Sequence, residues 1–182
     1  MKRLNREFYC KNSVTVAKKL LGKIIMRKYK GETLSGKIVE VEAYRGKDDS
    51  GSHAYKKKTK RNSIMFGKPG YAYVYLCYGN HYLLNVVAEK EGNAGAVLIR
   101  AVEPLKGINK MTNGPGKLTK AFFIDKKFNG EDIVKSKELF IVENSKKENF
   151  TIKATSRIGI KTGLDKKWRF YIKGNKFVSK IN

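Results

Sequence analysis

The spacing of apolar residues changes from helical to strand-like after residue 22 of this 182-residue chain. Between Ser13 and Gly22 the apolar side chains recur on one helical face, which predicts a helix that Ser13 caps and Gly22 ends. Further along, branched and aromatic residues favour strands. We predict strands at residues 23–26, 34–44, 71–78, 82–88, 96–102, 138–143, 157–160 and 168–173, with a short helix over 117–123.

A long segment without apolar periodicity, residues 45–70, interrupts the predicted strands. It holds several glycines and a lysine cluster, and a loop of this length inside a compact domain is usually functional or disordered. No repeat, low-complexity linker or shift of composition marks a domain boundary. We therefore expect residues 1–182 to form one domain with sheet at its centre.

The charge is strongly one-sided. Lysine and arginine number 40 against 16 acidic residues, which gives a formal net charge of +24 and a pI near 10.0. Such a field attracts polyanions, so nucleic acid is the first partner to consider. Membrane-surface proteins can be equally basic, but no basic amphipathic helix or lipidation signal is found. Charge alone separates neither DNA from RNA nor an enzyme from a binding module.

Several other classes of protein receive no support from the sequence. No stretch approaches the roughly 18 apolar residues of a membrane span, and the first residues lead into polar sequence, so we expect a cytoplasmic protein. Cys10 and Cys77 lack metal-binding spacing, and His53 and His81 are the only histidines. We expect no metal site, no disulfide and no cofactor, with Cys77 as a small buried hydrophobe.

The predicted strand at residues 34–44 carries three candidate functional groups. Alternation places Glu40, Glu42 and Tyr44 on one face of this strand, next to the long loop. Two carboxylates and a phenol would therefore share a face beside a loop whose length indicates a function. Taken alone, however, this segment favours an ordinary solvated strand face.

Two neighbouring segments add groups that suit nucleic acid. Residues 53–62 combine His53 with five basic side chains that could contact phosphate oxygens, although taken alone such a run in so basic a chain favours solvated surface. The basic residues are Lys56, Lys57, Lys58, Lys60 and Arg61.

A predicted hairpin follows the loop. Gly79 and Asn80 can supply the positive φ angles of a tight turn, which would place Tyr78 at an exposed tip. The tyrosines at 71, 73 and 75 share one strand face and either stack bases or form an aromatic core; the core interpretation is favoured without further information.

Eight short motifs, in order and spacing, together resemble the alkyladenine (3-methyladenine, methylpurine) DNA glycosylase family. Each motif is weak alone, but their joint occurrence over nearly the whole chain is highly specific. They are VEAY at 41–44, MFGKPG at 65–70, YVY at 73–75, YG at 78–79, VLIRAVEPL at 97–105, GPGKL at 114–118, RIG at 157–159 and WRFY at 168–171.

The resemblance implies an α+β fold, mainly antiparallel: one compact domain with a curved antiparallel β-sheet and peripheral helices, without the helix–hairpin–helix architecture. It also implies a monofunctional glycosylase of base excision repair. Glu42 would activate the water that hydrolyses the N-glycosidic bond, and Arg100 would help to position that water and the target nucleotide. The product would be an apurinic site without strand cleavage.

The same resemblance implies how a damaged purine is held. Tyr44 and His53 would sandwich the flipped base, with Tyr75 on the opposite side of the pocket, while Asn85 would clash with the 2-amino group of normal guanine. Tyr78 would enter the minor groove to fill the gap. The expected partner is double-stranded DNA with alkylated or deaminated purines (3-methyladenine, 7-methylguanine, hypoxanthine and ethenoadenine), bound by a nucleoid-associated monomer.

Some points stay open at this stage. The sequence does not decide whether Glu40 shares the pocket, which acid would protonate a neutral lesion, or what residues 125–151 do. A basic module that binds DNA or RNA without catalysis is the second hypothesis, against which the presence of Glu42 argues. A small-molecule enzyme of formyltransferase-like fold is a remote third, because no cofactor motif supports it.

Overall fold

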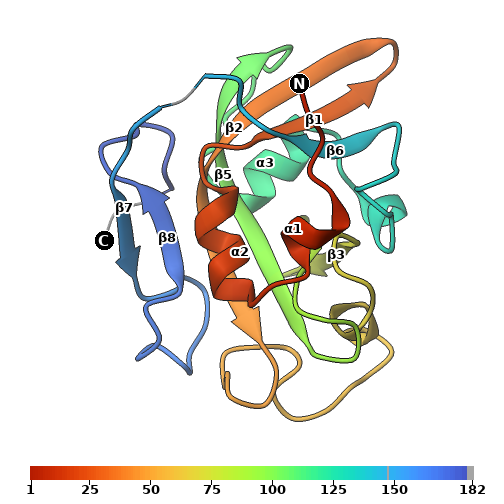
Figure 1. Cartoon of the computed structure of the whole chain (residues 1–182), viewed down its shortest axis with the longest axis vertical. Helices are drawn as coiled ribbons and strands as arrows, with labels where there is room; N and C mark the ends of the chain where they lie inside the picture. Colours follow the sequence, from red (N-terminus) through yellow and green to blue (C-terminus); the bar gives the residue numbers. More distant parts are fainter. Residues whose placement is uncertain (147, 180–182) are drawn as a thin grey trace.

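A single antiparallel sheet forms the centre of the protein (Figure 1), which we describe from a computed structural model over residues 1–146 and 148–179. Its main path runs in the order β3-β4-β5-β2-β1-β6, and β8 pairs with both β2 and β7. The strands are β1 (Ile24–Tyr29), β2 (Glu32–Arg45), β3 (Ala72–Cys77), β4 (His81–Val87), β5 (Gly95–Lys106), β6 (Leu139–Val142), β7 (Ile152–Thr155) and β8 (Arg169–Ile172).

The long strand β2 is the axis of this sheet. Along one edge it pairs with β5; along the other its first half pairs with β1, and Glu40 to Glu42 pair with β8. Every residue from Leu34 to Ala43 is buried. The prediction of a solvated strand face is therefore wrong. Both carboxylates lie inside the protein, because neighbouring strands flank β2 along both edges and the segment is buried.

Two register shifts interrupt the β2–β5 ladder at this point. Ile38 pairs with Val102 and Glu40 with Ala101, so Val39 has no partner on β5; Val41 then pairs with Ile99, which leaves Arg100 without a partner on β2. A β-bulge re-aims the side chain of its extra residue. The paired bulges thus bring Arg100 next to the carboxylates of β2.

Short helices surround the sheet. α1 (Arg6–Tyr9) and α2 (Ser13–Leu20) precede it, α3 (Pro115–Ala121) packs on β4 and β5, and 3₁₀ turns span Ser63–Phe66 (η1) and Lys126–Phe128 (η2). In Figure 1, α2 lies across β2 and β5. Within the described residues, no two of these helices form a helix–hairpin–helix unit, and the fold is the single compact α+β domain that we expected.

Two hydrophobic clusters stabilise this arrangement. The larger one joins α2, the middle of β2 and β5, and the residues around Phe122. The smaller one contains Met65 and Tyr73 and lies under the loop that connects β2 to β3. Because this loop, drawn at the bottom of Figure 1, has its own apolar core, it holds a defined shape despite its length.

Some local predictions were wrong. Asn12, not Ser13, caps α2: its side chain accepts from Val14 N at 3.0 Å, whereas Ser13 is the first helical residue. Residues 157–160 form a loop and not a strand, and β7 occupies residues that the sequence left unassigned. Both pieces are only four residues long, and long-range partners decided their structure: β7 pairs with β8, and Arg157 binds Asp49.

Candidate active site

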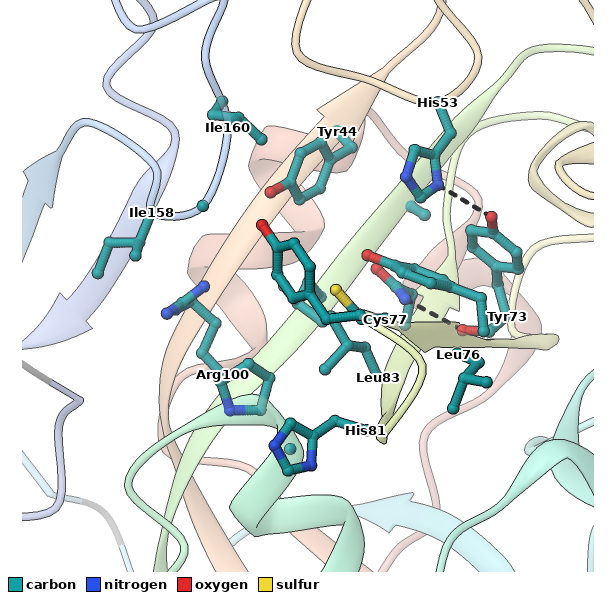
Figure 2. A pocket seen from close by; sticks show the side chains of 18 of the residues that line it. Tyr44, His53, Tyr73, Leu76, Cys77, His81, Leu83, Arg100, Ile158 and Ile160 are labelled. Carbon is teal, nitrogen blue, oxygen red and sulfur yellow. Dashed lines mark hydrogen bonds between the residues drawn. The ribbon is translucent and has the colours of Figure 1, made fainter.

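A cavity of about 660 Å³ opens at the ends of β2–β5. Figure 2 shows Tyr44 and His53 at one end of the view and His81 at the other. The walls come from β2, β3, β4 and β5, the loop before β3, the start of α3 and residues 158–160. Its volume lies in the range of small-ligand pockets, about 300–1,000 Å³.

Glu42 lies directly behind the cavity wall. Its side chain is 0% exposed and does not line the cavity, but all three of its polar partners do. Glu42 Oε1 accepts from Ile158 N at 2.7 Å and lies 3.3 Å from Arg100 Nη1, and Oε2 accepts from Tyr44 Oη at 2.8 Å. Burial raises the pKa of Glu42, although Arg100, Ile158 N and Tyr44 oppose that rise.

Arg100 connects the cavity to the sheet interior. Its Nε donates to Glu40 Oε1 at 3.1 Å, while Nη1 lies beside Glu42. Burial alone would lower the pKa of Arg100, but the carboxylates of Glu42 and Glu40 outweigh that effect and raise it. The guanidinium therefore brings a fixed positive charge to the wall next to Glu42.

Tyr44 is held from behind by a buried ion pair. Arg157 lies 4.7 Å from the centre of the Tyr44 ring, and its Nη1 and Nη2 bind Asp49 Oδ2 and Oδ1 at 2.7 and 2.6 Å. Arg157 Nη1 also donates to Ala43 O. Burial and the Glu42 carboxylate raise the pKa of Tyr44 well above its ordinary value, so its phenol stays a proton donor to Glu42.

His53, Tyr73 and Tyr75 form an aromatic wall across from Arg100. His53 Nδ1 lies 3.0 Å from Tyr73 Oη, and the His53 ring meets the Tyr75 ring edge-on at 4.8 Å between centroids. Arg61 lies over Tyr75 at 5.3 Å. Partial burial, together with the charge of Arg61, lowers the pKa of His53 below its ordinary value. The core interpretation of these tyrosines is confirmed for Tyr73, which belongs to the smaller core, and Tyr71 and Tyr75 pack against that core. Tyr73 and Tyr75 also line the cavity.

Asn85 lies in the floor of the cavity on β4. It is 3% exposed, and its Nδ2 donates to Tyr73 O at 3.1 Å. This bond fixes the amide orientation.

Tyr78 stands at the tip of the β3–β4 hairpin with 87% of its surface exposed. The turn differs from our expectation: positive φ angles occur at Tyr78 (49°) and Gly79 (72°), not at Asn80. An aromatic residue is strained in this left-handed region. The turn follows the end of β3 at Cys77 and lets Tyr75 and Tyr78 line the same cavity, which strict alternation would forbid.

The basic segment after His53 is anchored by a residue that the sequence did not single out. Asn62, 2% exposed, accepts from Thr59 N at 2.6 Å and donates to the carbonyls of His53 and Lys57 at 2.7 and 3.0 Å. The basic side chains of this loop are exposed, and Arg61 also reaches the cavity. The exposed set is Lys56, Lys57, Lys58, Lys60 and Arg61.

Comparison with known proteins gives the family of the chain. The family model described as Methylpurine-DNA glycosylase (MPG) matches residues 7–176. This chain belongs to that family. Relatives carrying the name "Putative 3-methyladenine DNA glycosylase" include one from Carboxydothermus hydrogenoformans, 48% identical over 97% of this chain and 98% of its own length. Another, from Legionella pneumophila (strain Paris), is 49% identical over 99% of this chain and its full length.

Membership in the methylpurine-DNA glycosylase family makes the chain a DNA repair hydrolase that cleaves N-glycosyl bonds and makes DNA its substrate. No helix in the described part of the chain is both long and apolar enough to cross a membrane. Residues 1–146 and 148–179 contain no cluster of three or more histidine, cysteine or acidic side chains that could hold a metal ion.

The structure brings most of the sequence-predicted site residues of this glycosylase to one cavity. Tyr44, His53, Tyr75, Tyr78 and Asn85 line it, as does Arg100, with Glu42 immediately behind. Cys77, expected to be buried, is partly exposed at the cavity because β3 ends there. Glu40 is buried, its carboxylate accepts hydrogen bonds from Arg100 and Arg169, and it does not line the cavity.

Sequence reasoning missed three supporting groups of the glycosylase site. Asp49 and Arg157 form the ion pair under Tyr44, and Ile158 supplies a backbone N–H to Glu42. The motif at 157–159 contains two of them and was the available signal. Its role was hidden because the contacts join positions more than 100 residues apart.

Proposed function

We propose that this glycosylase flips alkylated and deaminated purines out of duplex DNA and hydrolyses their N-glycosidic bond with a water molecule activated by Glu42. One observation carries the proposal. A buried carboxylate with a raised pKa is bonded to three residues that line an aromatic cavity, and the cavity opens beside an exposed tyrosine. Perturbed carboxylates at the edge of a pocket are typical of acid–base catalysts.

The attacking water has a defined place in this proposal. A carboxylate offers about four acceptor positions, and the contacts with Ile158, Arg100 and Tyr44 use three of them. The fourth, on Oε2, accepts the water. Since Glu42 is closed off by its partners, we expect entry of the nucleotide to shift part of this wall so that the water reaches Oε2.

The chemical step in this proposal depends on stabilisation of positive charge. Glycosidic hydrolysis develops positive charge on the sugar in an oxocarbenium-like transition state. Glu42 stabilises that charge and takes the proton of water, and Arg100 keeps the carboxylate oriented. An alkylated purine already carries positive charge and leaves without a strong acid on the opposite side. The nucleophile is water rather than a lysine, so the product is an apurinic site in an intact strand.

The aromatic walls support selection of the base. The rings of Tyr44, His53 and Tyr75 favour electron-poor or cationic purines, as cations prefer aromatic faces. Asn85 faces the same space and excludes the 2-amino group of guanine. Neutral lesions such as hypoxanthine and ethenoadenine fit the same walls and rely on easier extrusion, because mispaired or damaged bases cost less to unstack.

The test is release of free base. Purified protein is incubated with a methylated duplex, and free 3-methyladenine and strand integrity are both measured. We expect release of the base and intact strands until alkali cleaves the apurinic sites. Binding without release would identify the non-catalytic module instead, and strand cleavage without alkali would contradict hydrolysis by water.

We also predict that the basic loop sets the salt dependence of DNA affinity. Replacing Lys56, Lys57 and Lys58 together by alanine should flatten the slope of log K against log salt by about 0.9 for each phosphate that the variant no longer neutralises. Binding of undamaged duplex is measured from low to moderate salt. The matched control replaces the three exposed lysines Lys120, Lys126 and Lys127, and equal slopes for both variants would rule out this role of the loop.

A further inference from the structure

We infer that Glu40 is a positioning residue of the excision reaction: from inside the sheet it holds Arg100 against Glu42, and Ser179 of the C-terminal segment fastens it there. The inference rests on the proposed function, because it concerns how the proposed base is kept oriented. Glu40 itself touches neither the cavity nor, therefore, the DNA.

The contacts of Glu40 are unusually complete for a buried carboxylate. It is 0% exposed, and its Oε1 accepts from Arg100 Nε at 3.1 Å, Arg169 Nε at 2.7 Å and Ser179 Oγ at 2.8 Å. Its Oε2 accepts from Ser179 N at 2.7 Å. A buried charge is tolerated only when it is paired and hydrogen-bonded, and these contacts meet that requirement.

Arg100 transmits the position of Glu40 to Glu42. Its Nε is bound to Glu40, and its Nη1 lies 3.3 Å from Glu42 Oε1. Because the guanidinium is planar and rigid, fixing one edge fixes the other. The paired bulges that leave Val39 and Arg100 outside the ladder make this bridge possible. A regular ladder would point Arg100 elsewhere, so the irregularity serves the site.

The C-terminal segment completes the cluster. Ser179 is 6% exposed and donates from both its backbone N and its hydroxyl to Glu40, while its carbonyl accepts from Arg169 Nη2 at 3.3 Å. All three polar groups of Ser179 thus take part in one charged cluster, so the residue contributes hydrogen bonds as well as packing. These bonds tie residue 179, which is 139 positions away in sequence, to the carboxylate that orients Arg100.

The cluster also acts on Glu42 through charge. The groups that face the two carboxylates are Arg100 from β5, Arg169 from β8, Tyr44 from β2, and Arg157, Ile158 N and Ser179 from the C-terminal third. Burial raises the pKa of Glu42 most, Arg100 is the strongest influence that lowers it, and the negative charge of Glu40 raises it by less. When Glu40 no longer holds Arg100 against Glu42, the stronger of these two opposing charges is lost and the pKa of Glu42 rises.

The decisive experiment compares Glu40→Gln with the parent protein. Glutamine keeps the size and an acceptor oxygen but removes the charge. We expect the plateau of the single-turnover excision rate to fall several-fold and the acid limb of its pH profile to move to higher pH, because a released Arg100 no longer favours the ionised form of Glu42. Affinity for a duplex with a non-cleavable abasic-site analogue should stay within about twofold, since the DNA-binding surface is unchanged.

Two further variants make the outcome unambiguous. Glu103→Gln is the matched control, because this partly buried carboxylate on β5 pairs with Lys37 at 3.0 Å and with Asn175 at 2.7 Å, away from the cavity; its rate and pH profile should equal those of the parent. Ser179→Ala, which removes one hydroxyl, should lower the rate at unchanged affinity even if Glu40→Gln fails to fold.

An unshifted acid limb in folded Glu40→Gln would overturn the inference, as would an unchanged rate in Ser179→Ala. The proposed function fails differently: in that case Glu42→Gln retains the parental rate, or the parent releases no base. Parental excision that is lost in Glu42→Gln but untouched in the Glu40 and Ser179 variants rejects the inference alone.

Discussion

Replacing Glu42 by glutamine is expected to lower the single-turnover rate of 3-methyladenine release by about 10²- to 10⁴-fold, the usual contribution of a general base. Glutamine fits the same space and keeps an oxygen that can accept from Ile158 N, but it cannot take a proton from water. Affinity for an abasic-analogue duplex should be retained, because the aromatic cavity and the basic loop are unchanged. A variant that excises at the parental rate would remove Glu42 from the mechanism.

The parent enzyme should show the raised pKa of Glu42 in its pH profile. A general base works when ionised, so the rate is low at acidic pH and rises as the carboxyl loses its proton. Since burial raises the pKa of Glu42, that rise should be centred above the ordinary glutamate value of 4.5. The Glu42→Gln variant, which has no such group, should lose this limb along with most of the activity.

Replacing Tyr78 by alanine is expected to produce the second largest loss, about 10- to 100-fold in the rate of excision from a paired duplex. Stacking of an aromatic ring on a base contributes about 1–3 kcal/mol, and each 1.36 kcal/mol corresponds to about tenfold. The exposed ring at the hairpin tip would no longer offset the lost base stacking. Base release from duplex and single-stranded DNA is compared under single-turnover conditions.

The control for this prediction is Tyr78→Phe, which keeps the ring and should excise nearly as fast as the parent. The loss in Tyr78→Ala should also shrink on single-stranded substrate, where extrusion costs little. A defect that appears only as weaker, salt-sensitive binding would show that Tyr78 contacts phosphates instead of acting as a wedge.

Much of the sheet was predictable because its central strands carry dense branched and aromatic residues. The predicted strands at 34–44 and 82–88 overlap β2 and β4 closely. The short elements were harder to predict from the sequence. β7 has three exposed residues among its four, and residues 157–160 are held as a loop by the Arg157–Asp49 pair. In both cases long-range partners, not local apolar pattern, determine the structure.

Part of the candidate site, too, could be predicted from the sequence and part could not. The family motifs contain Tyr44, Tyr75 and Arg100, and the cavity is lined by all three. Asn85, which the resemblance also implied, lines the cavity although it lies outside the quoted motifs. Alternation put Glu40 and Glu42 on one face but could not separate their roles, since the separation arises from the bulges beside Arg100. The strained turn at Tyr78 was equally hidden, because a bulky residue is rarely found at positive φ.

The most direct test of the account is the structure of Glu42→Gln bound to a duplex that contains one excisable damaged purine. We predict that the damaged base lies outside the helix, against Tyr44, His53 and Tyr75. Tyr78 should fill the gap in the stack, and one ordered water should lie between residue 42 and the C1′ atom. A base that stays stacked in the helix, or one that enters the cavity with C1′ turned away from residue 42, would contradict the account.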